Sequence, residues 1–408
     1  MTNNLLRWLM PFREMDYEQQ NAVNNTLKPG TSFVYGPAGS GKTAIALYCA
    51  KVLQDLGKSY RVFIYTNVLD HFISAGAREL GLAPQSITTF YRWVWWQHKE
   101  QLGSPPNNGG AEKYSIWTDA LIRHWSTNPS RKPKFDYVII DEAQDFRANV
   151  AKLLHMVAPN LLVVADPVQS IYVDVASLAD LNTRWGPINH QLEVPRNYRN
   201  PMAVAKLAAA FVDGYGVSAG DFLKRVKGKP FDQKPLWYSV NSLSEQSRVE
   251  CEIIQQARGS VRIGILCRHQ DQIHDERARL QGMGVEVQIA LGTDGYDFNN
   301  PLPVLTTIHS AKGLEFDWVI LPYLNEESWA DAATDPKERR VFFVALTRAK
   351  ERLYLISQTG HECSFLKEIL AKDRDLLQQP RPSSTPTPTC PSCTATATGW
   401  TPTEQSPT

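Results

Sequence analysis

The segment GPAGSGKT at residues 36–43 constrains the fold of this 408-residue chain most strongly. It fits the pattern G-x-x-x-x-G-K-[ST], with an apolar, strand-like run at 33–35 before it and a helical run ending near Gly57 after it. Its glycines let the backbone curl so that N–H groups point at phosphates, at the positive end of the following helix. A strand, this loop and a helix predict part of a parallel α/β sheet.

The loop predicts a nucleotide site. Lys42 is placed to reach the β- and γ-phosphates, and the Thr43 hydroxyl to ligate Mg²⁺. The predicted nucleotide-binding set in this loop is Gly36, Pro37, Ala38, Gly39, Ser40, Gly41, Lys42, Thr43 and Ala44.

An acidic segment, DEAQD at 141–145, follows a second apolar run at 137–140. Asp141 is placed to hold a metal ion together with Thr43, and Glu142 to polarise an attacking water. ATP and Mg²⁺ are therefore the expected cofactors.

Further segments follow in a fixed order: QSIY at 169–172, NYR at 197–199, HSAKGLEF at 309–316 and VALTRAK at 344–350. Several lie more than 150 residues beyond the loop, where only a second domain brings them to the same phosphates. A guanidinium delivered across a cleft stabilises phosphoryl charge only when the cleft is shut. The pattern therefore indicates a machine that closes on ATP.

Together these motifs resemble the UvrD/Rep family of superfamily 1 DNA helicases over roughly residues 12–370. The resemblance implies that Gln19 reads the adenine edge and that Gln169 couples the γ-phosphate to the nucleic-acid track. It also implies that Arg348 is the arginine finger. The remaining implied nucleotide contacts are Tyr198 near the adenine, Arg199 at the γ-phosphate, Glu315 at the ribose, and Gly313.

The resemblance also implies 3′→5′ movement along single-stranded DNA, with bases stacked on aromatic side chains. The candidate contacts are Tyr65, Thr66, Asn67, Thr89, Phe90, Tyr172, Thr307 and His309. After QSIY the family places a stacking Trp or Phe, whereas this chain has Val173 and Asp174. The run FYRWVWW at 90–96 offers replacement platforms or a buried helix; burial is favoured because Trp93 and Trp96, three positions apart, are expected to share a helix face.

The chain predicts an α/β fold of two RecA-like P-loop NTPase domains, each a parallel sheet covered by helices, with ATP in the cleft between them. The expected boundaries are 1–195 for the first domain, 196–375 for the second and 376–408 for a disordered Pro/Thr-rich tail. Strands are expected at 31–35, 61–66, 136–141, 161–165, 264–268, 304–308, 317–322 and 352–357. The family's first large insertion is reduced to 91–135, and the second to a helix near 269–283 and a turn.

Composition argues against a strongly basic nucleic-acid-binding protein, a membrane protein and a secreted protein. The 43 basic and 42 acidic residues nearly cancel, so the protein as a whole does not attract nucleic acid electrostatically. A surface that binds a nucleic-acid strand must therefore be a local groove. No apolar run approaches membrane-spanning length and no signal peptide is evident, so a cytoplasmic protein is expected. Cys49, Cys251, Cys267 and Cys363 suit buried thiols. Cys390 and Cys393 form half of a zinc ribbon without its second pair, so a vestigial ribbon is favoured over a zinc site.

The leading hypothesis is therefore an ATP-dependent 3′→5′ single-stranded DNA translocase or helicase, acting in repair, replication or defence. One alternative is a regulatory, DNA-sensing ATPase subunit that controls a partner such as a nuclease. Another is an RNA translocase, because base stacking does not distinguish the sugars.

Overall fold

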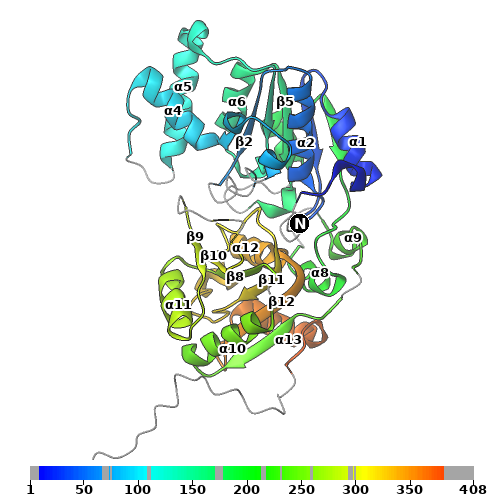
Figure 1. Cartoon of the computed structure of the whole chain (residues 1–408), viewed down its shortest axis with the longest axis vertical. Helices are drawn as coiled ribbons and strands as arrows, with labels where there is room; N and C mark the ends of the chain where they lie inside the picture. The colour runs from blue at the N-terminus through cyan, green and yellow to red at the C-terminus, as the bar shows by residue number, and fades with distance from the viewer. Residues whose placement is uncertain are drawn as a thin grey trace, which may run out of the picture.

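The computed structural model describes residues 9–66, 73, 76–107, 112–170, 178–212, 217–229, 232–257, 261–292, 297 and 300–380. Within them the chain forms two six-stranded sheets, one after the other in sequence and one above the other in Figure 1. Every paired strand runs parallel to its neighbour. The predicted α/β architecture of two helix-covered parallel sheets is confirmed. The two sheets with their helices are called the first unit and the second unit below.

The first sheet has the strand order β3-β2-β4-β5-β1-β6. Its strands are β1 (Thr31–Tyr35), β2 (Tyr60–Ile64), β3 (Ile87–Thr89), β4 (Tyr137–Ile140), β5 (Asn160–Ala165) and β6 (His190–Glu193). Its helices are α1 (Tyr17–Asn25), α2 (Lys42–Asp55), α4 (Phe90–Leu102), α5 (Lys113–Thr127), α6 (Ala148–Val157) and α7 (Leu178–Trp185).

Helices cover both faces of this sheet because successive strand residues point to opposite sides. Val34 and Val164 pack with α2 residues in one buried cluster. Phe33 and Val163, their neighbours along the same strands, pack with α4, α5 and α6 in another. With both faces covered, the edge where the strands end is left for the loops.

The second sheet has the order β7-β12-β11-β8-β10-β9. Its strands are β7 (Leu236–Val240), β8 (Ile263–Cys267), β9 (Gln288–Ala290), β10 (Val304–Thr307), β11 (Phe316–Leu321) and β12 (Ala349–Gln358). The second unit's helices are α8 (Met202–Ala209), α9 (Ala219–Lys224), α10 (Leu243–Gln256), α11 (Asp271–Gly282), α12 (Pro336–Leu346) and α13 (Ser364–Lys372). The expected buried thiols are confirmed for Cys49, Cys251, Cys267 and Cys363, which are all free and buried.

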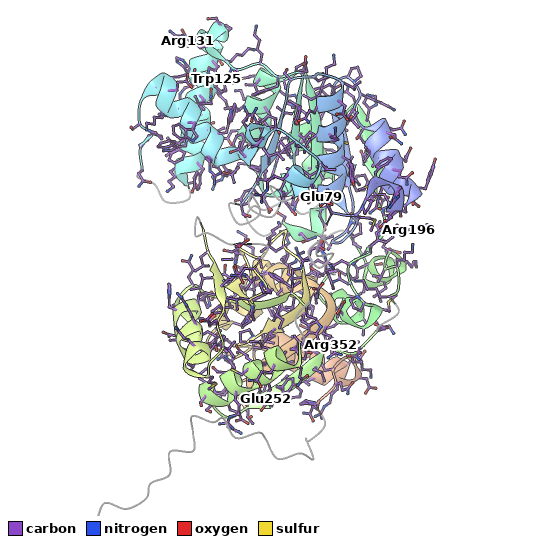
Figure 2. The ribbon with its side chains drawn as sticks, viewed as in Figure 1. Glu79, Trp125, Arg131, Arg196, Glu252 and Arg352 are labelled. Atoms are coloured by element: carbon purple, nitrogen blue, oxygen red, sulfur yellow. The ribbon has the colours of Figure 1, made fainter. Side chains whose placement is uncertain are left out.

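The reduced insertion is the α4–α5 hairpin. Trp93 and Trp125 pack across it with ring centroids 6.0 Å apart, and Trp125 and Arg131 lie at the end away from the second unit (Figure 2). The prediction that Trp93 and Trp96 share a buried face is wrong, because Trp93 is 6% exposed and Trp96 is 55% exposed. The inner stripe of α4 runs through Phe90, Trp93 and Val94, and Trp96 falls just outside it.

The chain continues to pack beyond residue 375, where the tail was expected to begin. Gln378 accepts a hydrogen bond from the backbone N–H of Trp237 at 2.9 Å and donates one to Pro235 at 2.9 Å. Residues 376–378 therefore lie against β7, beside the second sheet. Cys390 and Cys393 lie outside the described residues.

Candidate nucleotide-binding cleft

A cavity of about 550 Å³ has walls from both units. The predicted nucleotide-site residues that line it are Gln19, Ala38, Gly39, Gly41, Lys42, Thr43, Ala44, Glu142, Gln169, Tyr198, Arg199, Gly313, Glu315 and Arg348. Residues far apart in the sequence, such as Lys42 and Arg348, thus line the same cavity, as the motif order indicated. Ser40 and Asp141 are buried just behind this wall, and Gly36 and Pro37 line a smaller cavity on the other side of the loop.

The phosphate loop follows β1 and leads into α2, which begins at Lys42. Gly39 and Gly41 have φ values of +72° and +83°, in the left-handed region that favours glycine. A Cβ at Gly39 would lie 2.3 Å from Cβ of Arg199, and one at Gly41 would lie 2.5 Å from Nε2 of Gln19. The loop therefore requires glycine both for its backbone conformation and for its close neighbours.

Lys42 is buried in the loop. Its Nζ donates to the carbonyl oxygens of Gly36 at 2.9 Å and Pro37 at 2.8 Å, and lies 3.9 Å from Asp166. Burial lowers the pKa of Lys42, and the nearby carboxylates, Asp166 first, oppose that shift. A buried ammonium held mainly by weak carbonyl acceptors fits a site for an anionic phosphate.

Thr43 and Asp141 meet as predicted for a metal site. The Thr43 hydroxyl donates to Oδ2 of Asp141 at 2.7 Å. Burial and the neighbouring Glu142 raise the pKa of Asp141 to about 6. A hydroxyl and a carboxylate side by side next to the loop are oxygen ligands that suit Mg²⁺, and a cation there would favour the ionised form of Asp141.

Glu142 occupies a strained position directly after Asp141. Its φ is 54°, which is uncommon for a residue other than glycine. Gln144 donates to its Oε2 at 2.5 Å. Burial alone would raise the pKa of Glu142, but the cations of Lys312, Lys42 and Arg348 outweigh it and lower the pKa. The side chain is therefore an ionised acceptor on the cavity wall.

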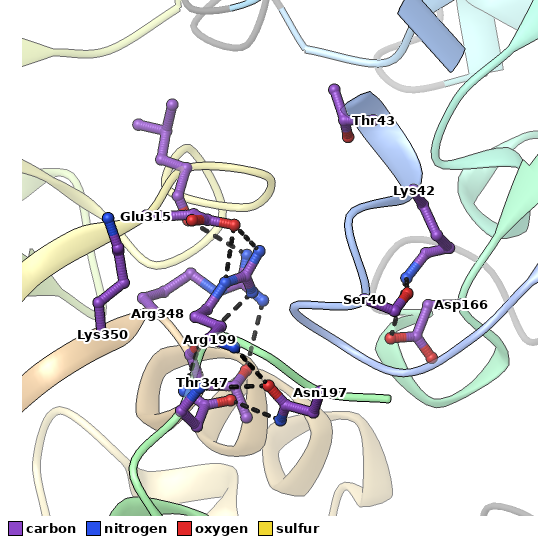
Figure 3. A network of polar contacts seen from close by, with 12 residues as sticks. Ser40, Lys42, Thr43, Asp166, Asn197, Arg199, Glu315, Thr347, Arg348 and Lys350 are labelled. Atoms are coloured by element: carbon purple, nitrogen blue, oxygen red, sulfur yellow. Dashed lines mark hydrogen bonds and ion pairs between the residues drawn. The ribbon is translucent and has the colours of Figure 1, made fainter. Parts of the chain in front are cut away.

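The second unit contributes the facing wall (Figure 3). Arg348 is buried, and its Nη2 donates to Oε1 of Gln169 in the first unit at 2.5 Å. Burial, together with Arg199, lowers the pKa of Arg348 to about 9. Arg199 donates to Oε1 of Glu315 through Nε at 2.8 Å. Burial opposes ionisation of Glu315, but Arg199 and Lys350 lower its pKa to about 2.

The part of the cavity wall around Gln19, which is predicted to bind adenine, also includes residues that sequence reasoning missed. Gln19 completes a capping box with Asp16 at the start of α1, and its Nε2 donates to the Ser40 carbonyl at 3.0 Å. Tyr198 is half-buried on the cavity wall, and its N–H donates to the Gly39 carbonyl at 2.9 Å. The missed cavity-lining residues are Leu9, Met10, Pro11, Glu14, Met15 and Lys350. The apolar stretch before Gln19 was the only signal for most of them.

The predicted nucleic-acid contacts have mixed outcomes. Tyr65 and Thr66 are half-buried after β2, Thr89 is buried at the end of β3, and Thr307 and His309 lie at and after the end of β10. Burial and the nearby cations Arg268 and Lys312 lower the pKa of His309 to about 4.

The assignment of Phe90 as a base contact is wrong for this structure. Its ring is fully buried against Phe63, Trp93 and Phe146, so it has no surface to offer a base. Asn67 and Tyr172, with Val173 and Asp174, lie outside the described residues.

None of the helices that the structure describes is long and apolar enough to cross a membrane.

Parts of this chain are similar to known protein families and to known proteins. Residues 19–174 match the AAA domain family, and residues 300–360 match the UvrD-like helicase C-terminal domain family. A probable DNA helicase of Mycoplasma pneumoniae is 29% identical over 238 residues, covering 54% of this chain and 43% of that protein. The ATP-dependent DNA helicase PcrA of Staphylococcus epidermidis is 33% identical over 102 residues, covering 21% of this chain and 14% of the relative.

Among solved structures, the C-terminal domain of a possible DNA helicase from Lactobacillus plantarum WCFS1 aligns with a TM-score of 0.34 and 17% identity, over 45% of this chain and 98% of that one. The chain thus spans less than half the length of the curated relatives it matches. The predicted resemblance to UvrD/Rep-type helicases is confirmed by these two matched domains and by relatives named as DNA helicases.

Proposed function

We propose that the chain is an ATP-dependent translocase on single-stranded DNA that moves in the 3′→5′ direction, as the UvrD/Rep resemblance implies. The observation that carries the proposal is the single cavity shared by Lys42, Glu142 and Arg348, which come from both units. One buried cation and one carboxylate stand on the first wall, and a guanidinium stands on the other. This is the arrangement that phosphoryl transfer to water requires.

Each residue has a proposed task. Lys42 and the loop N–H groups bind the phosphates, and Thr43 and Asp141 hold Mg²⁺, which neutralises charge on the phosphate oxygens when bound. Glu142 accepts a proton from the attacking water. Arg348 stabilises the charge that develops on the γ-phosphoryl oxygens. Arg199 breaks its ion pair with Glu315 and then stabilises the same oxygens.

Nucleic acid is proposed to lie across the ends of β2, β3 and β10. Tyr65, Thr66 and Thr307 follow or end these parallel strands. In the first sheet, β4 lies between β2 and β5, so the acidic segment after β4 stands between the proposed track and the phosphate loop. The residues proposed for ATP hydrolysis and those proposed to bind nucleic acid would thus lie at the same ends of the strands.

Translocation is expected to exceed strand separation. A motor on one strand opens a duplex only if something blocks re-annealing, at roughly 1.4 kcal/mol of stacking per base pair. The first insertion is limited to the α4–α5 hairpin, and α11 is a 12-residue helix where the family resemblance implies a larger insertion. Efficient unwinding is therefore expected to need a partner.

The test measures ATP turnover without polymer and with single-stranded DNA, duplex DNA and RNA, followed by streptavidin displacement from 3′- and 5′-biotinylated oligonucleotides. The proposal predicts stimulation by single-stranded DNA, displacement from the 5′ end, and weak separation of duplexes longer than about two helical turns. Stimulation by RNA alone would identify an RNA translocase. Stimulation by DNA without displacement from either end would favour a regulatory ATPase subunit, and displacement from the 3′ end would refute the polarity.

A further inference from the structure

Lys312 is a buried lysine of the second unit whose charged end reaches into the first unit. Its side chain is 2% exposed. Its Nζ lies 2.5 Å from Oδ2 of Asp145, donates to the backbone carbonyl of Gln169, and lies 4.0 Å from Oε2 of Glu142. The lysine therefore joins the segment that carries Glu142 to the segment that carries Gln169.

Lys312 sits in the middle of a short connection between β10 and β11. Thr307 ends β10 at one end of this connection, and Glu315, the partner of Arg199, stands at the other. The connection is held by its own hydrogen bonds: Ala311 N–H to the Thr307 carbonyl at 2.9 Å, and Leu314 N–H to the Ala311 carbonyl at 2.9 Å. These hydrogen bonds, with one from the Lys312 N–H to the His309 carbonyl at 3.3 Å, connect Thr307 to Lys312.

The proposed nucleic-acid end has groups that can bind a phosphate. Thr307 Oγ1 donates to Ser310 Oγ at 3.0 Å, and the Ser310 N–H donates back to Thr307 Oγ1 at 3.1 Å. His309 and Ser310 are half-buried. A phosphate oxygen bound by these hydroxyls and N–H groups would compete with their mutual hydrogen bonds and shift the turn.

Two other second-unit cations also reach this end of the first-unit strand. Arg340 Nη1 donates to the Ser170 carbonyl at 3.1 Å, and Arg348 Nη2 donates to the Gln169 side chain. Lys312 also forms ion pairs with Asp145 and Glu142. It thus links the β10–β11 connection directly to the proposed base.

We propose that Lys312 is a positioning residue that transmits nucleic-acid binding at Thr307–Ser310 to the acidic segment 141–145, so that hydrolysis responds to the strand. This inference rests on the proposed function and adds its regulation. Lys312 does not touch the reacting atoms. It holds Asp145, and through the 142–145 turn it sets the position of Glu142.

The test is a double-mutant cycle of Lys312→Met and Asp145→Asn, with Lys367→Met as control. Met keeps the length of the side chain and removes its charge, and Lys367 is an exposed lysine paired with Glu326. Turnover without DNA, turnover with saturating single-stranded DNA, KM for ATP and the unfolding temperature are measured for each protein.

Each single variant is expected to reduce the stimulation by DNA about tenfold, with KM for ATP changed less than about threefold. The double variant is expected to lose no more stimulation than either single variant, because both remove one interaction. Losses that multiply, or unchanged stimulation in Lys312→Met, would overturn the proposal. So would equal losses of turnover with and without DNA that follow the unfolding temperature.

A second measurement applies where a variant is too unstable for turnover assays at 25 °C. The affinity for single-stranded DNA is measured with and without a non-hydrolysable ATP analogue at low temperature. The wild type is expected to show a nucleotide-dependent change that Lys312→Met lacks, and retention of that change overturns the proposal. A wild type that hydrolyses no ATP refutes the proposed function itself, whereas a stimulated wild type with an equally stimulated Lys312→Met refutes only the role of Lys312.

Discussion

Arg348 and Gln169 join the two units by a hydrogen bond, in which Nη2 of Arg348 donates to Oε1 of Gln169 at 2.5 Å and both side chains are buried. Both residues also line the shared cavity. A guanidinium already held at the cleft by a first-unit amide needs little reorganisation to meet a phosphoryl oxygen. Preorganisation of this kind is what makes an arginine effective in phosphoryl transfer.

Glu142→Gln is expected to lower ATP turnover by at least about 10², because the amide cannot accept the proton of the attacking water. Nucleotide affinity should persist, since Thr43 and Asp141 remain. Rapid-quench turnover and fluorescent-nucleotide titration check the two effects separately. Glu326→Gln, which changes an exposed carboxylate in the same way, is the control. Near-normal turnover in Glu142→Gln would refute its role as the base.

Gly39→Ala and Gly57→Ala form a matched pair in the first unit. Both glycines have positive φ, +72° and +64°, so both substitutions cost about 1–2 kcal/mol of stability. An added Cβ meets Arg199 at 2.3 Å in Gly39→Ala, whereas Gly57 has no neighbour within 4 Å. We expect about a 10²-fold loss of turnover for Gly39→Ala only, because the loop and Arg199 must move apart. Equal turnover in the two variants would contradict the tight fit.

Glu250→Gln is expected to flatten the pH dependence of stability. Burial, and the adjacent carboxylate of Glu276, raise the pKa of Glu250 well above its ordinary value of 4.5. Glu276 itself accepts hydrogen bonds from Ser247 at 2.9 Å and Gln246 at 3.1 Å. The folded protein thus keeps a proton that the unfolded chain releases above pH 4.5, so the free energy of unfolding falls as pH rises through that range.

Denaturant unfolding from about pH 4.5 to about pH 8 measures this slope, with about 1.4 kcal/mol for each unit of pKa difference. Glu250→Gln should be more stable than the wild type at the alkaline end. Glu252→Gln, on the exposed side of the same helix, serves as the control. A wild type that gains stability between these two pH values through Glu250 would show the opposite sign and contradict the assignment.

Trp93→Ala and Trp96→Ala test the placement of the hairpin. Trp93 is 6% exposed and packs between Phe63 and Trp125, so its loss should cost about 3–5 kcal/mol of unfolding free energy. Trp96 is 55% exposed and contacts Trp95 and Lys99, so its loss should cost less than about 1 kcal/mol. Thermal and chemical unfolding of the two variants should therefore differ clearly. Similar losses of unfolding free energy would contradict this orientation of α4.

The sequence predicted the inner strands of both sheets and missed the edges. Strands β1, β4, β5, β8, β10 and β11 are short apolar runs with both faces covered, so composition alone marks them. The strands that were not predicted, β3, β6, β7 and β9, are the edge strands of the two sheets. An edge strand such as β6, with the sequence HQLE, is partly exposed and carries no apolar run. Its position is set by pairing with β1.

The cleft also contains residues that the sequence predicted and contacts that it did not. The motif residues of the phosphate loop, Glu142 and Arg348 were identified because each lies in a recognisable local pattern. Asp166 and Lys312 lie in the segments ADPVQSIY and HSAKGLEF, yet their contacts with Lys42 and Asp145 join distant parts of the chain. No local pattern encodes such a pair. Phe90 was misassigned because its motif position gives no information on which way α4 turns the ring.

Steady-state ATP turnover with and without single-stranded DNA, measured on the wild type, Arg348→Ala and Arg352→Ala, tests most directly whether both units serve one nucleotide site. Arg352 lies in β12, four positions beyond Arg348, with its guanidinium 4.6 Å from the centre of the Trp318 ring (Figure 2). We predict DNA-stimulated turnover in the wild type and Arg352→Ala, and about a 10³-fold loss in Arg348→Ala with nucleotide affinity retained. Full turnover in Arg348→Ala, or no turnover by the wild type with DNA present, would contradict a shared catalytic cleft.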